Sequence, residues 1–239
     1  MFNYVANILT FLSLIFGFVS IIFSLENHFT FASWAIIISV ALDGLDGQVA
    51  RKNPLHNEFG KELDSLVDVV SFGIAPSVLG YIFVYRDFYL LATIALFIYL
   101  ACSVMRLAKY NITPKEELTS YFYGLPTTAS GGFLASFILI YRRYTRLPSP
   151  YIFLVLVLLL AFLMVSKIKY LNLDGIRQIF RKNIAISFVI IAIVALVLLG
   201  GCWVASIFLP EAAIFSLFSI YLIFAPFMVK SVEIRYLKE

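Results

Sequence analysis

Long apolar runs, separated by short charged segments, occupy almost the whole chain of 239 residues. A helix that crosses a bilayer needs ~20 predominantly apolar residues, with a range of about 17 to 25. Eight runs approach or reach that length, although only Pro210-Glu211 separates the last two. The predicted spans are Val5–Leu25, Phe29–Ala50, Leu63–Tyr85, Phe88–Arg106, Tyr121–Tyr141, Pro150–Ser166, Ile184–Ala205 and Ala212–Val229. The pattern predicts an all-α polytopic membrane protein with about eight transmembrane helices, forming a single domain over residues 1–239.

Composition supports a membrane location. Hydrophobic residues make up 62% of the chain and charged residues only 13%, whereas a soluble domain has about 25% charged residues. The net charge of +4 is modest, and in a membrane protein it bears on orientation and on contact with anionic lipids. We therefore expect an integral protein of the cell membrane, in contact with membrane lipids and without a nucleic-acid partner.

Basic residues are unevenly distributed between the two sides that eight spans would define. The segments 51–62, 106–115 and 167–182, with the C-terminal tail, lie on one side and hold 14 of the 18 Lys and Arg residues. The other side has Arg86, Arg142, Arg143 and Arg146. Because Lys and Arg accumulate in cytoplasmic loops, we predict that both termini and the loop 52–62 are cytoplasmic.

Four aspartates interrupt the apolar pattern at one place. Asp43 and Asp46 lie at the end of the second predicted span, and Asp64 and Asp68 lie at the start of the third. The short connection predicts an antiparallel helical hairpin, and at ~100° per residue each pair of aspartates shares one helix face. The spacing therefore predicts that two pairs of carboxylates face each other at the cytoplasmic end of the hairpin.

Carboxylates that converge in membrane helices need a counter-charge. An acid at the centre of such a helix costs ~2.5–3.5 kcal/mol, and four anions repel one another. Oxygen ligands suit Mg²⁺, Mn²⁺ or Ca²⁺, and four carboxylates could hold two such ions, as in many phosphoryl-transfer sites. Beside them, Gly47 and Ala50 would let a flat ligand approach, and the Arg51 guanidinium could grip phosphate. These features suggest a nucleotide diphosphate ligand; the alternative is that the acids are ordinary hydrated residues at a membrane boundary.

The spacing of these residues resembles the signature of the CDP-alcohol phosphotransferase family. The matching positions are Asp43, Asp46, Gly47, Ala50, Arg51, Gly60, Asp64 and Asp68. The resemblance implies a multi-helix membrane enzyme whose four aspartates bind two divalent metal ions, Mg²⁺ or Mn²⁺ with Ca²⁺ as a further option. It also implies that Asp68 completes this site and acts as the general base.

The same resemblance assigns the nucleotide contacts. It implies that the cytidine pocket is lined by Gly47, Ala50, Gly60 and Asp64, and that Arg51 holds phosphate. On the first span, Asn7 and Thr10 match residues that contact the pyrophosphate in similar proteins. Hydrogen bonding between helices is the alternative role for these two side chains.

Three further stretches indicate the acceptor alcohol. Residues 64–77, 106–111 and 122–132 resemble the branch of the family that uses L-serine. Branches that use glycerol phosphate or inositol typically place Lys or Arg after the last aspartate, where this chain has Val69. The chain departs from the serine branch at Thr127-Thr128, where a second proline often follows Gly-Leu-Pro. The implied reaction transfers the phosphatidyl group of CDP-diacylglycerol, or of a CDP-archaeol-like ether lipid, to L-serine and releases CMP.

Candidate contacts to serine follow from charge and position. Arg106 or Lys109 could bind the carboxylate, and Ser71 or a backbone carbonyl freed near Pro76 could accept the ammonium. Alternative roles are helix packing for Ser71 and a plain positive-inside role for the two cations.

Two alternative functions remain open at this point. Within the family, the acceptor could be glycerol 3-phosphate, inositol or inositol phosphate. In a different class, membrane carboxylates serve cation-coupled transporters, but these usually place charges at the bilayer midplane on broken helices of repeated halves, and no repeat is visible here. The pattern does not determine whether the protein is a homodimer.

Overall fold

The computed structural model describes residues 2–51, 58–113, 121–143, 150–171 and 210–236. The chain divides into two compact units. The first unit comprises Met1–Ile112 and Thr127–Val165, and the second comprises Thr113–Pro126 and Ser166–Glu239. Every aspartate of the predicted site belongs to the first unit.

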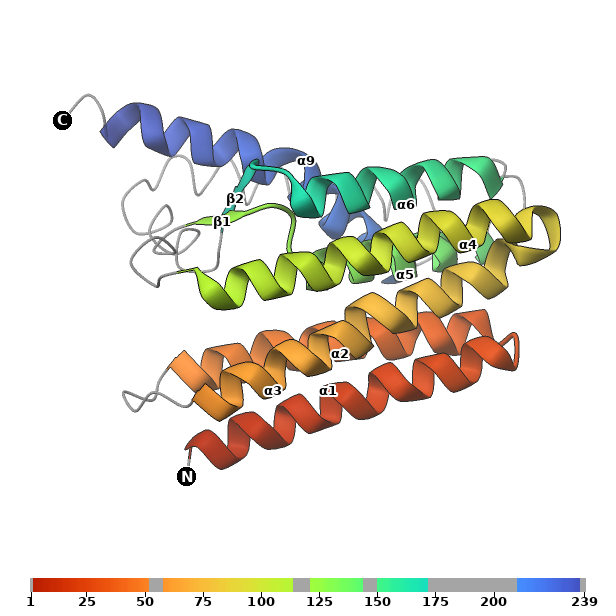
Figure 1. Cartoon of the computed structure of the whole chain (residues 1–239), viewed down its shortest axis with the longest axis horizontal. Helices are drawn as coiled ribbons and strands as arrows, with labels where there is room; N and C mark the ends of the chain where they lie inside the picture. The colour runs from red at the N-terminus through yellow and green to blue at the C-terminus, as the bar shows by residue number, and fades with distance from the viewer. Residues whose placement is uncertain (1, 52–57, 114–120, 144–149, 172–209, 237–239) are drawn as a thin grey trace. The chain divides into compact units, whose positions relative to one another are not determined.

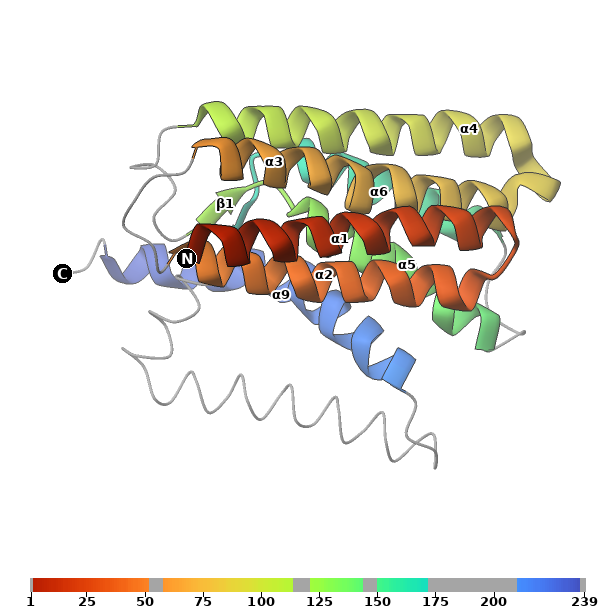
Figure 2. The same ribbon diagram turned by 90° about the horizontal axis from the view of Figure 1, so that it is seen from below.

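The first unit is a bundle of helices that run side by side (Figures 1 and 2). Its helices are α1 (Phe2–Leu25), α2 (Phe29–Arg51), α3 (Glu58–Asp68), the π-helix η1 (Val69–Ile74), α4 (Ala75–Ile112), α5 (Thr127–Arg143) and α6 (Pro150–Val165). A tight turn joins α1 to α2, with Asn27 in the left-handed region at φ 63°, a conformation that asparagine tolerates better than most residues. The predicted hairpin between the second and third spans is present as α2 and α3.

Within the described ranges, four helical segments are long and apolar enough to cross a membrane: Val5–Leu25, Phe29–Val49, Glu58–Val84 and Tyr89–Ile112. They agree with the first four predicted spans. The helical hydrogen-bond pattern of α4 continues between the third and fourth segments, although the chain reverses direction there (Figures 1 and 2). Shorter apolar helices cover Tyr151–Val165 and Pro210–Pro226.

The outer surface of the bundle is apolar. Large side chains such as Phe18, Phe97 and Phe162 are among its most exposed residues, with Phe97 68% exposed. In water such a surface would favour aggregation, whereas lipid tails solvate it without cost. The chain is therefore a helical membrane protein, as predicted; the count of eight spans and the cytoplasmic termini stay predictions.

Buried serines and small residues bring α1 and α2 together. The hydroxyls of Ser13 and Ser39 lie 2.7 Å apart, and Ser39 Oγ also donates to the Ser13 carbonyl at 3.0 Å. Ala32, Ala35 and Ile36 on α2 are fully or almost fully buried. Without a hydrophobic driving force between helices in lipid, small residues and such hydrogen bonds stabilise the helix pair. This contact fixes the register of α1 against the helix that carries Asp43 and Asp46.

The second unit contains a short sheet that the apolar pattern does not predict. Strand β1 (Tyr121–Tyr123) pairs antiparallel with β2 (Lys169–Leu171), with Phe122 opposite Tyr170. The unit also contains α9 (Pro210–Tyr236). This helix covers the eighth predicted span, but its apolar part, Pro210–Pro226, is shorter than the four membrane segments. The seventh predicted span, Ile184–Ala205, lies outside the described residues.

The fifth predicted span, Tyr121–Tyr141, is wrong over its first residues. Residues 121–123 form β1, and the helix begins only at Thr127. Gly124 adopts φ 78° and donates its N–H to the Ile168 carbonyl at 2.7 Å. Pro126 then disfavours helical geometry at Leu125. The Gly-Leu-Pro sequence therefore ends the strand and delays the helix, although hydropathy continues through it.

Candidate active site

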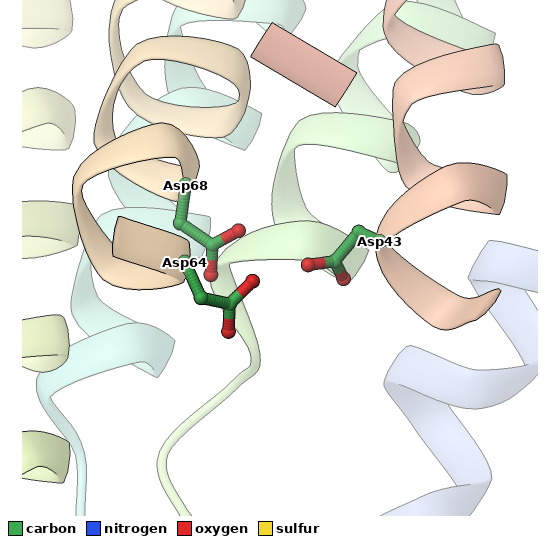
Figure 3. A group of neighbouring side chains, drawn as sticks. All are labelled: Asp43, Asp64 and Asp68. Atoms are coloured by element: carbon green, nitrogen blue, oxygen red, sulfur yellow. The ribbon is translucent and has the colours of Figure 1, made fainter. Parts of the chain in front are cut away.

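Three carboxylates converge between α2 and α3. Asp43 extends from α2, and Asp64 and Asp68 extend from successive turns of α3 toward it (Figure 3). One ligand oxygen of each aspartate lies within 4.8 Å of those of the other two. Asp43 lies in the last third of the membrane segment Phe29–Val49, and Asp64 and Asp68 lie in the first half of Glu58–Val84. The sequence spacing predicted that aspartates of the two helices face each other, and these three side chains do so.

This arrangement fits a divalent cation. Oxygens that share a Mg²⁺ or Ca²⁺ ion lie about 2.0–2.6 Å from it, so they can be no more than about 4–5 Å apart. Asp68 is 9% exposed, and among the described residues its Oδ1 has no hydrogen-bond partner. A buried carboxylate oxygen without a partner is costly. A hard cation with oxygen ligands would satisfy it, and these three residues are the candidate ligands.

Asp46 lies beside the cluster and is held by α1. Thr10 Oγ1 donates a hydrogen bond to Asp46 Oδ2 at 2.9 Å, and the two side chains are each 4% exposed. Asp46 also interacts electrostatically with Asp43. The predicted set of four carboxylates is therefore divided into three that converge and a fourth whose orientation Thr10 controls. This hydrogen bond joins two helices, which is the alternative role predicted for Thr10 from the sequence.

The start of α5 supplies polar contacts that the sequence pattern did not predict. The Thr128 side chain hydrogen-bonds to Asp43, and Thr127 Oγ1 accepts a hydrogen bond from Arg106 Nη1 at 3.1 Å. Arg106 interacts electrostatically with Asp43 and Asp68. Thr127-Thr128 departs from the pattern of the serine branch, and in the structure both residues contact the site. The sequence feature that could have identified these two threonines is their position in the first turn of a helix.

Asn111, at the end of α4, holds α3 in place. Its backbone carbonyl accepts a hydrogen bond from Lys61 Nζ at 2.8 Å, and its side-chain oxygen accepts one from Ser65 Oγ at 3.0 Å. Its amide nitrogen donates to Glu62 Oε2 at 3.2 Å. Because Ser65 is adjacent to Asp64, these bonds limit how far the acidic face of α3 can rotate.

The remaining predicted nucleotide contacts occupy the same helices. Gly47 on α2 and Gly60 on α3 are half-buried, as is Asn7, which lies one turn before Thr10 on α1. Ala50 and Arg51 complete α2, but their side chains lie outside the described residues. The α2–α3 hairpin thus carries every predicted nucleotide contact except Asn7 and Thr10, which are on α1.

The predicted serine contacts have different surroundings. Lys109 is exposed and lies one turn beyond the half-buried Arg106 on α4. Ser71 is fully buried, and its hydroxyl donates to the Ser13 carbonyl at 3.2 Å. The carbonyl that Pro76 frees is that of Phe72, and it accepts the Tyr99 hydroxyl at 3.0 Å. Both groups considered for the ammonium are therefore bonded inside the bundle, whereas Arg106 faces the aspartates.

Comparisons with known proteins identify the family. Residues 3–166, which include every site residue discussed above, match the family model for CDP-alcohol phosphatidyltransferase. A CDP-diacylglycerol–serine O-phosphatidyltransferase of Helicobacter pylori is 31% identical over 205 residues, covering 85% of each chain.

Two archaeal proteins are similar over shorter stretches. A protein of the same name from Methanocaldococcus jannaschii is 36% identical over 167 residues, covering 70% of this chain and 73% of that protein. An archaetidylserine synthase of Methanothermobacter thermautotrophicus is 33% identical over 162 residues, covering 66% of each chain. Together with the converging aspartates, these matches confirm the resemblance seen in the sequence: the chain belongs to the CDP-alcohol phosphatidyltransferase family.

Proposed function

We propose that this enzyme transfers the phosphatidyl group of CDP-diacylglycerol, or of an analogous CDP-linked ether lipid, to L-serine and releases CMP. The observation that carries the proposal is the convergence of Asp43, Asp64 and Asp68 beside Arg106. Carboxylates suit the cations that accompany a pyrophosphate, and the guanidinium suits an acceptor that bears a carboxylate. The names of the bacterial and archaeal relatives support serine as that acceptor.

The aspartates would hold two divalent metal ions, Mg²⁺ or Mn²⁺, with Ca²⁺ also compatible with the oxygen ligands. When bound, such ions neutralise charge on the phosphate oxygens and on the departing nucleotide. The candidate ligands that lie close enough to share an ion are Asp43, Asp64 and Asp68. Asp46 interacts with this group through Asp43. Thr10 and Thr128 orient the two aspartates of α2.

In the proposed reaction, Asp68 takes the proton of the serine hydroxyl. The serine oxygen forms a bond to the phosphorus that carries the lipid, and the bond from that phosphorus to the oxygen of CMP breaks. CMP leaves with the electron pair of that bond, so charge and atoms balance without a covalent enzyme intermediate. Asp68 Oδ1 is buried and has no hydrogen-bond partner among the described residues, so its capacity to accept a proton is not used by the fold, which supports this role.

Small residues and one cation would position the nucleotide. Gly47, Ala50 and Gly60 carry little or no side chain, which would allow a cytidine ring to approach the α2–α3 hairpin. Arg51, at the end of α2, would hold phosphate, and Asn7 on α1 would reach the pyrophosphate. The positive-inside pattern supports a cytoplasmic location for this end of the bundle.

Charge favours serine over acceptors that carry a phosphate. A phosphate acceptor would add about two negative charges to a site that already has four carboxylates and a pyrophosphate, and it would need further cations. The residues that follow Asp68 are Val69 and Val70, which supply none. Serine requires one cation for its carboxylate, and Arg106, oriented by Thr127, meets this need. Lys109 is the second candidate for this contact.

The test is an acceptor panel with purified protein and CDP-diacylglycerol. Serine should exceed glycerol 3-phosphate, inositol and inositol phosphate by at least ~10³ in kcat/KM, because mismatched polar groups in a buried site discriminate by that much or more. Lipid product and CMP are both measured. If glycerol 3-phosphate is the better acceptor, serine is wrong and the family assignment stands; if no CMP is released with any acceptor, the proposed chemistry is wrong.

A further inference from the structure

The helix that carries Asp64 and Asp68 changes its winding directly after Asp68. Residues up to Asp68 form α3, and Val69–Ile74 form the π-helix η1, in which the Ala75 N–H bonds to the Val70 carbonyl five residues back. A π-turn inserts one extra residue into a helical turn, is rare, and often occurs at functional sites. Its position here, adjacent to the proposed general base, requires an explanation.

Pro76 explains why the wide turn forms. Proline has no N–H, and in an α-helix its ring clashes with the carbonyl four residues earlier, which here is the carbonyl of Phe72. A wider turn relieves that clash but leaves the Phe72 carbonyl without its α-helical donor. Phe72 is fully buried, so the carbonyl needs another partner.

Tyr99 supplies that partner from α4. Its hydroxyl donates to the Phe72 carbonyl at 3.0 Å and accepts a hydrogen bond from Ser130 Oγ of α5 at 3.1 Å. Tyr99 and Ser130 are both completely buried. One hydroxyl thus links the π-turn to a later part of α4 and to α5.

Glycines hold the same turn from two other sides. A Cβ at Gly17 of α1 would lie 2.8 Å from Ser71 Cα, and one at Gly131 of α5 would lie 3.2 Å from Phe72 Cα. At both positions the absence of a side chain lets a neighbouring helix approach the widened turn. The π-turn is therefore enclosed by α1, α4 and α5, and its conformation is determined by packing.

The extra residue changes the angular offset between Asp68 and the residues that follow it. One residue corresponds to ~100° of rotation about a helix axis. With the π-turn in place, α3 presents Asp64 and Asp68 to Asp43, while the following residues present Ser71 to α1 and Phe72 to α4 and α5. If the turn relaxed to α-helical winding, one of these two sets of contacts would rotate away.

We propose that Tyr99 is a positioning residue that holds the η1 turn through the Phe72 carbonyl and thereby orients Asp68 toward Asp43 and Asp64. Tyr99 needs no contact with either substrate for this role. The inference rests on the proposed role of Asp68 as a metal ligand and base, but it does not depend on which alcohol is the acceptor.

The test is the Tyr99→Phe variant, assayed for Mn²⁺ affinity by electron paramagnetic resonance and for CMP release from CDP-diacylglycerol. Removing a partner that orients a metal ligand typically costs 10- to 100-fold in affinity or rate. We expect about tenfold weaker Mn²⁺ binding and about tenfold lower kcat, while the KM for CDP-diacylglycerol changes less than about twofold. The KM should be insensitive because Tyr99 is completely buried and its hydroxyl bonds to Phe72 and Ser130 inside the bundle.

Matched controls separate positioning from general damage to the fold. Tyr170→Phe changes another buried tyrosine, located on β2 of the second unit, and should leave Mn²⁺ affinity unchanged. Ser130→Ala should weaken Mn²⁺ binding, whereas Ser136→Ala should not, because Ser136 on the same helix bonds only to the Phe133 carbonyl among the contacts seen. If Tyr99→Phe does not fold, the comparison of Ser130→Ala with Ser136→Ala still tests whether the Tyr99 hydroxyl positions Asp68.

Wild-type Mn²⁺ affinity in both Tyr99→Phe and Ser130→Ala would overturn the inference. Equal losses in the Tyr99 and Tyr170 variants would overturn it as well, because they would indicate a loss of stability without specific positioning. If the wild-type protein binds Mn²⁺ and releases CMP but does not use serine, the acceptor proposal is wrong, and the comparison of Mn²⁺ affinities still decides the role of Tyr99.

Discussion

The hydrogen bond between Thr10 and Asp46 offers a sharp test of how the site is assembled. Thr10→Val keeps the shape of the side chain and removes the hydroxyl that donates to Asp46 Oδ2 at 2.9 Å. The same hydroxyl also lies 3.0 Å from the Ala6 carbonyl of its own helix. An ionised carboxylate is a stronger acceptor than a backbone carbonyl. The substitution should therefore affect Asp46 more than it affects α1.

The magnitude follows from burial. Both side chains are 4% exposed, so water cannot replace the lost donor. A hydrogen bond to a charged group contributes about 1.5–3 kcal/mol, which is about 10- to 150-fold at 1.36 kcal/mol per factor of ten. We expect Thr10→Val to lower Mn²⁺ affinity and kcat by a factor in that range. Thr10→Ser retains the hydroxyl, so both quantities should stay within about threefold of wild type.

Electron paramagnetic resonance of Mn²⁺ and steady-state CMP release measure the two quantities separately. Thr93→Val is the matched control, because Thr93 Oγ1 donates to the Tyr89 carbonyl of its own helix at 2.7 Å and is not near the aspartates in sequence. Unchanged Mn²⁺ affinity in Thr10→Val, together with a raised KM for CDP-diacylglycerol, would contradict this role of Thr10. That outcome would instead assign Thr10 to the pyrophosphate, the other role predicted from the sequence.

Other predictions concern the remaining parts of the site. EDTA should abolish activity and Mg²⁺ or Mn²⁺ should restore it; activity that persists after complete metal removal would contradict the metal assignment. Asp68→Asn should lower kcat by about 10² to 10⁴, the usual contribution of a general base, as measured by CMP release at saturating serine; turnover near the wild-type rate would exclude Asp68 as the base. Arg106→Ala should raise the KM for serine much more than the KM for CDP-diacylglycerol, and a selective rise in Lys109→Ala alone would transfer the carboxylate contact to Lys109. Single cysteines at Asn53 and Glu239, both outside the described residues, should resist an impermeant thiol reagent in intact cells, and labelling of position 53 from outside would reverse the predicted topology.

Glycine and proline positions show why hydropathy alone gave a wrong helix boundary. Hydropathy continues from Tyr121 to Tyr141, so a window average indicates one span. The backbone conformation of Gly124 and the restriction imposed by Pro126 instead end a strand and start α5 at Thr127. In the same way, Pro76 within an apolar run marks the π-turn. The missing N–H of Pro76 does not by itself show which group donates to the Phe72 carbonyl instead.

The amino-acid pattern was enough to predict a helical membrane protein and carboxylates that share helix faces. Both conclusions depend on periodicity along one segment, which local residues set. The family signature between Asp43 and Asp68 is also local, because the α2–α3 hairpin brings its two halves together over a short connection. For this reason the amino-acid pattern alone is enough to place Asp43, Asp64 and Asp68 in one site.

The residues that orient those carboxylates could be identified only from the packing of the helices. Thr10 reaches Asp46 across 36 positions of sequence, and Tyr99 reaches Phe72 across 27. These contacts depend on the register between helices, which the close approach of Gly17 to Ser71 and of Gly131 to Phe72 helps to set. A shift of one residue turns a helix by ~100° and would separate each pair, and periodicity along a single helix carries no information about its register against another.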